Sequence, residues 1–294
     1  MGTAGRPELS TVTPPIVGDP VTALTGVEPA TERVGIRRVL GKIGQWALSL
    51  AVVLGAWWLF LKVFHIDPFI GKTPVDVWRF LTTAETADQT RTTLYHASLT
   101  TLRDAFIGLA AGTFAALTCA IAFNLSRSIE QTLMPMAMVL RSVPLVAMTP
   151  LIALIFGRGL LGVTVIAGIV TFFPTLVNVT LALRATPQAS IDLCQAYGGS
   201  RMTTLRKVQL PSALPAVFAS LRIAAPLALI GALLAEWLAT GKGLGYLMLQ
   251  STTLSNYNML WAATALVTAY SLLLYTAISG IENIVLQRYG DVAV

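Results

Sequence analysis

Long apolar runs constrain the fold of this chain more than any other feature of its sequence. A helix rises 1.5 Å per residue, so it needs about 20 apolar residues to cross the hydrocarbon core of a bilayer. About six runs of the chain approach that length. Hydrocarbon provides no partner for an unpaired backbone N–H or C=O group, so such runs must be helical. The sequence therefore predicts an all-α integral membrane protein with about six transmembrane helices.

Six spans are expected, and the third is the least regular of them. The expected ranges are 46–64, 105–123, 145–156, 160–183, 216–238 and 259–285. The third range is too short to cross a bilayer alone, so we expect it to extend backwards through residues 133–140. Pro144 and Pro150 interrupt this span, and Arg141 lies within its approach.

The composition agrees with a membrane protein and excludes other classes. Hydrophobic residues make up 55% of the chain and charged residues 12%, whereas soluble domains carry about 25% charge. The net charge of +6 is what basic flanks of membrane spans require, and no basic patch with interleaved aromatic residues indicates nucleic-acid binding. Cys119 lies in a span and Cys194 in a loop, so no disulfide is expected.

Basic residues indicate how the chain is oriented, because they favour cytoplasmic loops. The segment just before the first span carries Arg33, Arg37, Arg38 and Lys42. The loop between the fourth and fifth spans carries Arg184, Arg201, Arg206 and Lys207. This bias predicts that both termini and the loop around residues 192–211 are cytoplasmic, which agrees with six spans.

The expected organisation has a tail, a first span, a core and a second tail. Residues 1–43 are predicted to form a disordered cytoplasmic tail. Residues 44–100 hold the first span and an external amphipathic segment that starts at Thr73-Pro74. The core transmembrane domain covers 101–285 with a cytoplasmic loop at 184–215, and residues 286–294 form a short C-terminal tail.

Enzyme chemistry is absent from the sequence patterns. Gly71-Lys72-Thr73 imitates the end of a phosphate-binding loop, but Ile66 occupies the position where the first glycine is needed. His65 and His96 do not form a zinc motif, and no nucleophile elbow is present. We therefore expect no catalytic residue, no cofactor, no metal and no enzymatic activity of the chain itself.

One polar loop has a distinctive spacing. Asp192 stands six positions before Gly198, Val208 follows ten positions after that glycine, and Leu210-Pro211 closes the run. The residues can form two short helices: one around 187–197 and a second over about 201–208. Between them Gly198-Gly199 supplies the turn and Ser200 the helix cap, and Pro211 is expected to end the second helix.

This loop closely resembles the EAA loop of permease subunits of ABC importers. The family pattern is E-A-A, three residues, G, nine residues, I-x-L-P. The matching residues are Asp192, Leu193, Cys194, Gly198, Val208, Leu210 and Pro211. Asp192-Leu193-Cys194 stands for the family's E-A-A and Val208 for its isoleucine. The resemblance implies a type I ABC importer permease-like fold, with the loop docking as a coupling helix onto a separate ATP-binding subunit.

The resemblance also implies further partners and a location. Members of this family work as permease dimers in the bacterial plasma (inner) membrane, with an extracytoplasmic solute-binding protein outside. Residues 141–157, 171–178 and 235–248 look like the branch that takes up nitrate, taurine and aliphatic sulfonates. The same branch resemblance covers importers of vitamin precursors.

Four residues are candidates for the translocation path or gate. Glu236, near the outer end of the fifth span, is either a functional intramembrane acid or an interfacial acid paired with Lys242 or a backbone end. Arg141 either attracts anions at the cytoplasmic mouth or is an ordinary basic flank. Pro144 would kink a gating helix, and Asn178 would hydrogen-bond a solute or another helix.

Two other function classes remain as alternatives. A secondary transporter driven by an ion gradient should carry intramembrane carboxylates or broken helices in matched halves, and only Glu236 partly fits. A non-transporting scaffold would lack an ATPase partner. The presence of that partner separates the three classes.

Overall fold

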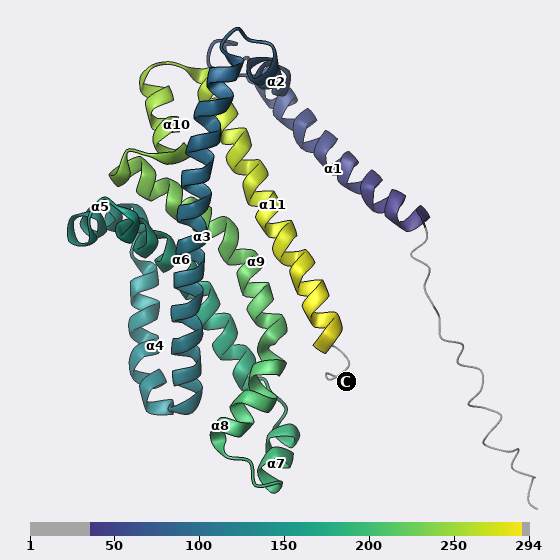
Figure 1. Cartoon of the computed structure of the whole chain (residues 1–294), viewed down its shortest axis with the longest axis vertical. Helices are drawn as coiled ribbons and strands as arrows, with labels where there is room; N and C mark the ends of the chain where they lie inside the picture. Colours follow the sequence, from purple (N-terminus) through teal and green to yellow (C-terminus); the bar gives the residue numbers. More distant parts are fainter. Residues whose placement is uncertain (1–35, 290–294) are drawn as a thin grey trace, which may run out of the picture. The chain divides into compact units, whose positions relative to one another are not determined.

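The structure is a computed structural model that describes residues 36–289, and every regular element in that range is a helix (Figure 1). The chain divides into two compact units, residues 1–56 and 57–294. Most of the predicted tail, residues 1–35, lies outside the described residues. The first helix, α1 (Ile36–Val63), begins inside the range predicted as tail, and its described apolar part, Leu48–Val63, is shorter than 18 residues.

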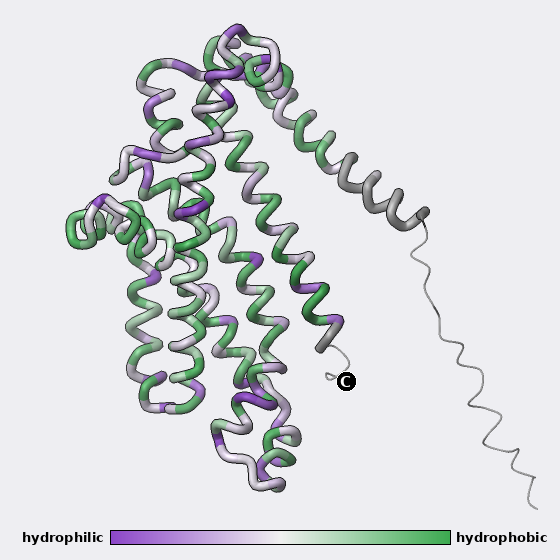
Figure 2. Tube along the Cα trace, in the orientation of Figure 1, coloured by the Kyte–Doolittle hydropathy of each residue, from purple (hydrophilic) through white to green (hydrophobic). Residues whose placement is uncertain are grey.

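The second unit contains the helical bundle. Its elements are α2 (Pro74–Thr82), α3 (Ala87–Leu125), α4 (Arg127–Ser142), α5 (Leu145–Phe156), α6 (Leu160–Arg184), α7 (Gln188–Ala196), α8 (Arg201–Thr204), the π-helical segment η1 (Leu205–Gln209), α9 (Leu210–Ala235), a second π-helical segment η2 (Glu236–Thr240), α10 (Gly243–Thr253) and α11 (Tyr257–Tyr289). Apolar residues cover the helices, while hydrophilic residues gather toward the two ends of the bundle (Figure 2).

Four described helices are long and apolar enough to cross a membrane. They are Ala87–Leu125, Leu160–Arg184, Arg201–Thr240 and Tyr257–Gln287. These correspond to the expected second, fourth, fifth and sixth spans. Within the described residues the total is four, or five if α4 and α5 together count as one span, so the predicted number of six is not exact.

The third expected span is a sharply bent pair of helices rather than one rod. The axes of α4 and α5 differ by 105°. Val143 and Pro144 are both extended, and Val143 is so because a residue that precedes proline avoids the α-helical region. The expected backward extension through residues 133–140 therefore belongs to a separate helix, and Pro150, which was expected to interrupt the span, lies inside α5.

Small residues let the three central helices approach closely. A side chain built on Gly112 would overlap Thr171 and the Gly168 carbonyl of α6, and one built on Gly108 would overlap Ala167. On α9, a Cβ at Gly231 would lie 2.6 Å from the Ala167 Cα atom. In lipid the hydrophobic effect does not drive helices together, so close backbone packing of this kind stabilises their association instead. The core of the bundle is therefore the packing of α3, α6 and α9.

The helix α2 begins with a capping box. The Asp76 N–H donates to Thr73 Oγ1 at 3.3 Å, and Asp76 Oδ2 accepts from the Thr73 hydroxyl at 2.7 Å and from the Thr73 N–H at 2.9 Å. These hydrogen bonds, that from the Thr73 hydroxyl first, lower the pKa of the Asp76 carboxyl. The box thus contributes stability above the unfolded pKa of about 3.9 and loses it as the pH falls through the lower folded value.

Pro211 does not end its helix, contrary to the expectation from the sequence. The helix that starts at Arg201 continues through η1 into α9. In η1 the Leu210 N–H donates to the Leu205 carbonyl, five residues back, so the turn just before Pro211 is wide. A widened turn accommodates the missing proline N–H and the proline ring without breaking the helix.

Candidate functional site

The loop singled out by its spacing folds as a helical hairpin at one end of the bundle (Figure 1). The helix α7 follows Pro187, and the chain then turns at Gly198, whose φ of +77° suits glycine. A Cβ at Gly199 would lie 2.6 Å from the carbonyl oxygen of Cys194, so this position also requires glycine. Ser200 caps α8 through a hydrogen bond from the Thr203 N–H. The two helices and the Gly-Gly turn agree with the sequence prediction.

The tip of the hairpin presents apolar side chains to solvent. Leu193 is 61% exposed and Tyr197, at the end of α7, is 87% exposed. Asp192 is exposed beside them and accepts a hydrogen bond of 2.8 Å from Gln188. Large apolar residues that remain exposed on a rigid turn are typical of a surface that a partner covers. Tyr197 was not among the residues that the spacing selected, although it directly precedes the glycine pair.

Val208, Leu210 and Pro211 lie at the base of the hairpin, in η1 and at the start of α9, whereas Cys194 contacts Gly199 at the turn. Cys194, Val208, Leu210 and Pro211 are half-buried. Leu205, between them in η1, is 2% exposed and belongs to the core formed with α3 and α6. The structure therefore separates the selected set into an exposed tip and a base packed on the bundle.

Polar contacts connect this base to the ends of two spans. Gln209 Oε1 accepts from Asn124 Nδ2 of α3 at 2.7 Å, and Gln209 Nε2 lies 3.5 Å from the Leu183 carbonyl of α6. Arg201 donates to the carbonyl oxygen of Leu125 at 3.3 Å. These groups border a cavity of about 190 Å³. The hairpin is thus fixed to α3 and α6 by directional bonds.

An ion pair braces the same end of the bundle. Arg184, in the last turn of α6, pairs with Glu130, in the first turn of α4. Glu130 is largely buried, so the pair fixes where α4 starts relative to the hairpin. Both charges also lie at the helix ends that favour them, the acid near an N-terminus and the base near a C-terminus.

Two of the four path candidates share one cavity. Arg141 and Pro144, at the bend between α4 and α5, line a cavity of about 480 Å³. Phe173 and Pro174 of α6 and Ile223 of α9 form other walls. Arg141 is exposed, and no ion pair involves it among the described residues. The cavity is therefore mostly apolar with a single cation at its edge.

Asn178, the third path candidate, does not line this cavity. It lies one turn beyond Pro174 on α6 and is half-buried. Within the described part of the chain its side chain has no hydrogen-bond partner, whereas the Thr175 hydroxyl donates to the Thr171 carbonyl. The structure therefore leaves open to Asn178 both roles that the sequence suggested.

Glu236, the fourth candidate, lies away from that cavity and is fully buried. Its Oε2 atom accepts from the Thr101 hydroxyl of α3 at 2.9 Å and from the Gly245 N–H at 2.8 Å, while Oε1 has no partner. Thr101 Oγ1 in turn accepts from the Leu244 N–H at 2.8 Å. The side chains of Thr101 and Glu236 thus cap the N-terminus of α10 from other helices. Of the two partners suggested for Glu236 by the sequence, the structure shows a backbone helix end and not Lys242.

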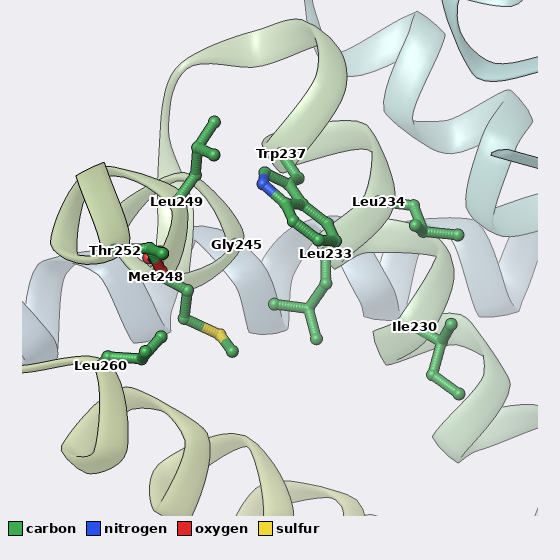
Figure 3. A pocket seen from close by; sticks show the side chains of 9 residues that line it. All are labelled: Ile230, Leu233, Leu234, Trp237, Gly245, Met248, Leu249, Thr252 and Leu260. Carbon is green, nitrogen blue, oxygen red and sulfur yellow. The ribbon is translucent and has the colours of Figure 1, made fainter. Parts of the chain in front are cut away.

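A second cavity adjoins this cap. It has a volume of about 290 Å³ and lies between the end of α9, η2, α10 and the start of α11. Met248 extends between Leu260 and Leu233, and Trp237, half-exposed, forms one side (Figure 3). Thr252 is the one residue with a polar side chain other than Trp237 in the lining, so the cavity offers space for apolar groups.

The spacing arguments missed one ion pair between two of the long apolar helices. Arg222 of α9 and Glu282 of α11 are joined by two contacts, Nε to Oε2 at 3.1 Å and NH2 to Oε1 at 3.3 Å. In sequence the two residues are 60 positions apart, and no local pattern connects them. Among the described residues no group of His, Cys, Asp and Glu side chains could hold a metal ion.

Comparison with known proteins identifies the family. Residues 108–291 match the family described as "Binding-protein-dependent transport system inner membrane component". A probable ABC transporter permease protein of Haemophilus influenzae is 32% identical over 231 residues, which cover 79% of this chain and 92% of that protein. The riboflavin transport system permease protein RibX of Chloroflexus aurantiacus is 34% identical over 161 residues, 55% of this chain and 60% of that protein.

More distant relatives carry the names of other solutes. The taurine transport system permease protein TauC of Escherichia coli is 26% identical and covers 83% of this chain and 89% of its own length. Further relatives are named for a formylaminopyrimidine, aliphatic sulfonates and nitrate.

A solved structure has the same fold. A chain of the MetNI methionine ABC transporter, in an inward-facing conformation, superimposes with a TM-score of 0.59 at 20% identity, covering 67% of this chain and 98% of that one. Together with the family match and the apolar helices, this likeness leads to one assignment. The chain belongs to the inner-membrane components of binding-protein-dependent transport systems and is a multi-pass permease subunit of the ABC importer type.

Proposed function

We propose that this chain forms the translocation path of an ATP-driven importer and that residues 192–211 dock onto a separate ATP-binding subunit. The observation that carries the proposal is the rigid hairpin of α7 and α8. It presents Leu193 and Tyr197 to solvent, and hydrogen bonds at its base connect it to α3 and α6. A partner protein that binds the apolar tip could move the hairpin, and the hydrogen bonds at its base would pass this movement to α3 and α6.

Two copies of the chain would form one path, with an extracytoplasmic solute-binding protein at the outer face. Both termini and the hairpin would be cytoplasmic, in the bacterial plasma membrane, as the basic residues favour. Closure of the ATP-binding subunits would move the paired hairpins, and ATP hydrolysis would return them. Membership in an ABC permease family disfavours the alternative of an ion-gradient-driven secondary transporter.

For the solute we propose a small anion of the nitrate, taurine or aliphatic sulfonate type. The cavity at the bend between α4 and α5 holds about 480 Å³, is mostly apolar, and has Arg141 at its edge. A guanidinium matches the oxygen atoms of a sulfonate or nitrate, and the apolar wall matches a short alkyl chain. Relatives named for taurine, sulfonates and nitrate support this class.

The docking proposal predicts the effect of Gly198→Glu. The new side chain would occupy a left-handed backbone position and place a negative charge beside the exposed tip. We expect the tagged variant to insert normally but to lose the ATP-binding subunit that co-purifies with the wild-type chain in mild detergent. ATP-dependent solute uptake should fall to background.

The matched control is Gly157→Glu, which adds the same charge at an exposed glycine with φ of +82° between α5 and α6. This control should keep the ATP-binding subunit bound. Retention of the subunit and normal uptake by Gly198→Glu would refute the docking assignment. Uptake by the wild-type chain without any ATP-binding subunit would instead favour the secondary transporter.

The solute proposal has its own test. In proteoliposomes that contain the complete importer, Arg141→Gln is expected to reduce taurine, sulfonate or nitrate uptake about tenfold, because one charge-assisted hydrogen bond contributes roughly 1.5 kcal/mol. ATP-binding subunits should remain attached, since Arg141 lies away from the hairpin. If instead riboflavin or a pyrimidine is transported and the anions are not, the substrate class is wrong while the importer assignment stands.

A further inference from the structure

The longest membrane helix of the chain is bounded by two π-helical segments. The helix runs over Arg201–Thr240, with η1 near its start and η2 at its end. A π turn carries one residue more than an α turn, is uncommon, and is found mostly at functional positions. Each of the two segments here carries one polar residue that bonds to α3: Gln209 in η1 and Glu236 in η2.

These two contacts lie at opposite ends of the same helix pair. The helices α3 and α9 run antiparallel, so the start of α9 meets the end of α3, and the end of α9 meets the first half of α3 (Figure 1). At the hairpin end, Gln209 bonds to Asn124. At the other end, Glu236 bonds to Thr101. Between the two contacts, Ala105 and Leu109 of α3 belong to one apolar core with Ala225 and Ala228 of α9. Among the described residues no other side-chain hydrogen bond joins α3 to α9 along this stretch.

Both contacts also hold a third element. Gln209 reaches the Leu183 carbonyl at the end of α6, next to the hairpin. Glu236 and Thr101 together accept the first free N–H groups of α10, from Gly245 and Leu244. One contact therefore joins α9 to the hairpin side of the bundle, and the other joins α9 to α10.

The Glu236 carboxyl group is in close contact with the backbone at the start of α10. Gly243 has a φ of +86°, and a side chain on it would overlap the Glu236 carboxyl group. Gly241, just before it, has a φ of +67°. Since the carboxyl group lies directly against this backbone, a displacement of Glu236 must carry the start of α10 with it. The helix α10 forms one wall of the cavity in Figure 3.

We propose that Gln209 and Glu236 are positioning residues that make α9 a transmission rod, which carries displacement of the hairpin to α10 at the far end of the bundle. Buried polar groups are costly when unpaired, so each contact exchanges one paired arrangement for another instead of loosening gradually. The widened π turns are the places where that exchange can occur without breaking α9. This inference rests on the proposed coupling of the hairpin to ATP hydrolysis.

The first test removes the contact at the hairpin end. Gln209→Leu and Asn124→Leu each delete one partner, and the double variant deletes both. The complete importer in proteoliposomes is assayed for ATP hydrolysed and solute transported. Each single variant is expected to keep hydrolysis within about twofold of wild type and to lower solute transported per ATP about fivefold, the range of one interhelical hydrogen bond in a membrane. The double variant should lose no more than the singles, because the residues act as a pair.

The second test examines the contact at α10. Glu236→Gln keeps an acceptor oxygen for Thr101 and Gly245 and should retain transport per ATP within about twofold, whereas Thr101→Val should reduce it about fivefold. A fluorophore is attached at exposed position 254, at the end of α10, through Leu254→Cys in a chain that also carries Cys119→Ala and Cys194→Ala. Its emission should respond to ATP in this background and with Glu236→Gln added, but not with Gln209→Leu added. The matched control is Thr118→Val, whose hydroxyl bonds only within α3.

The outcomes separate this inference from the proposed function. If hydrolysis and transport fall together in Gln209→Leu and Asn124→Leu, or if neither changes, the residues are structural or irrelevant and the inference is wrong. An ATP response at Leu254 that persists in Gln209→Leu also overturns it. Failure of the wild-type chain to bind an ATP-binding subunit at all would reject the proposed function instead.

Discussion

Gly112→Leu is expected to abolish the folded permease, because no space exists for a side chain where α3 crosses α6. The new Cβ atom alone would overlap Thr171 and the backbone of Gly168. Backbone atoms cannot turn away as a flexible side chain does, so the helices must separate. Overpacking of this kind costs about 3 kcal/mol or more, a large part of the stability of an ordinary domain. The measurement is the fraction of protein that elutes as a single species from gel filtration after mild extraction, before and after heating.

Gly280→Leu is the matched control for this substitution. Gly280 lies on α11, and a Cβ atom there would meet no other atom within 4 Å. This variant should elute as wild type does and unfold within a few degrees of it. If Gly112→Leu also behaves as wild type, the close packing of α3 against α6 is not what holds the bundle together.

The second large effect is expected at the ion pair between α9 and α11. Arg222→Met would leave the Glu282 carboxylate, which is only 8% exposed, without its guanidinium partner. Removing one partner of a buried pair costs about 3 kcal/mol or more, because the remaining charge stays desolvated. The midpoint of unfolding in a denaturing-detergent titration should therefore fall strongly, with no change in the structure of the hairpin of α7 and α8.

A double substitution provides the sharper test of this pair. Arg222→Met with Glu282→Leu removes both charges and keeps apolar volume, so it should be more stable than either single variant. The coupling energy from the four proteins gives the interaction directly. If the losses of the two single variants simply add in the double variant, the two groups do not act as a pair.

Much of the hairpin could be predicted because its determinants are local. A glycine pair sets the turn, Ser200 caps the following helix, and Pro187 precedes the first. Each of these rules involves a residue and its near neighbours, so spacing along the chain is sufficient. The membrane helices were predictable for the same reason, since apolar length is a property of a continuous segment.

The failures concern partners that are distant in sequence. The effect of Pro211 depends on a π turn whose Leu205 side chain packs against α3 and α6, which lie far away in sequence. Glu236 could be recognised as unusual, but its acceptor role needs Thr101, which lies 135 positions earlier. A local signal did exist for the crossing of α3 and α6. Gly108 and Gly112 are spaced four apart, the spacing with which small residues line helix contacts in membranes.

The cap on α10 also determines when this protein can finish folding in the membrane. Thr101 accepts a hydrogen bond from the Leu244 N–H and Glu236 accepts one from the Gly245 N–H. During synthesis Thr101 emerges long before these N–H groups, and Glu236 emerges shortly before them. Until α3 and α9 lie side by side, the Leu244 N–H lacks its acceptor on Thr101, and Glu236 has the Gly245 N–H but lacks the Thr101 hydroxyl. The start of α10 therefore reaches its final hydrogen bonding only after α3 and α9 have paired. A chain in which that pairing fails keeps a polar helix end without its acceptor, which costs free energy wherever water does not reach it.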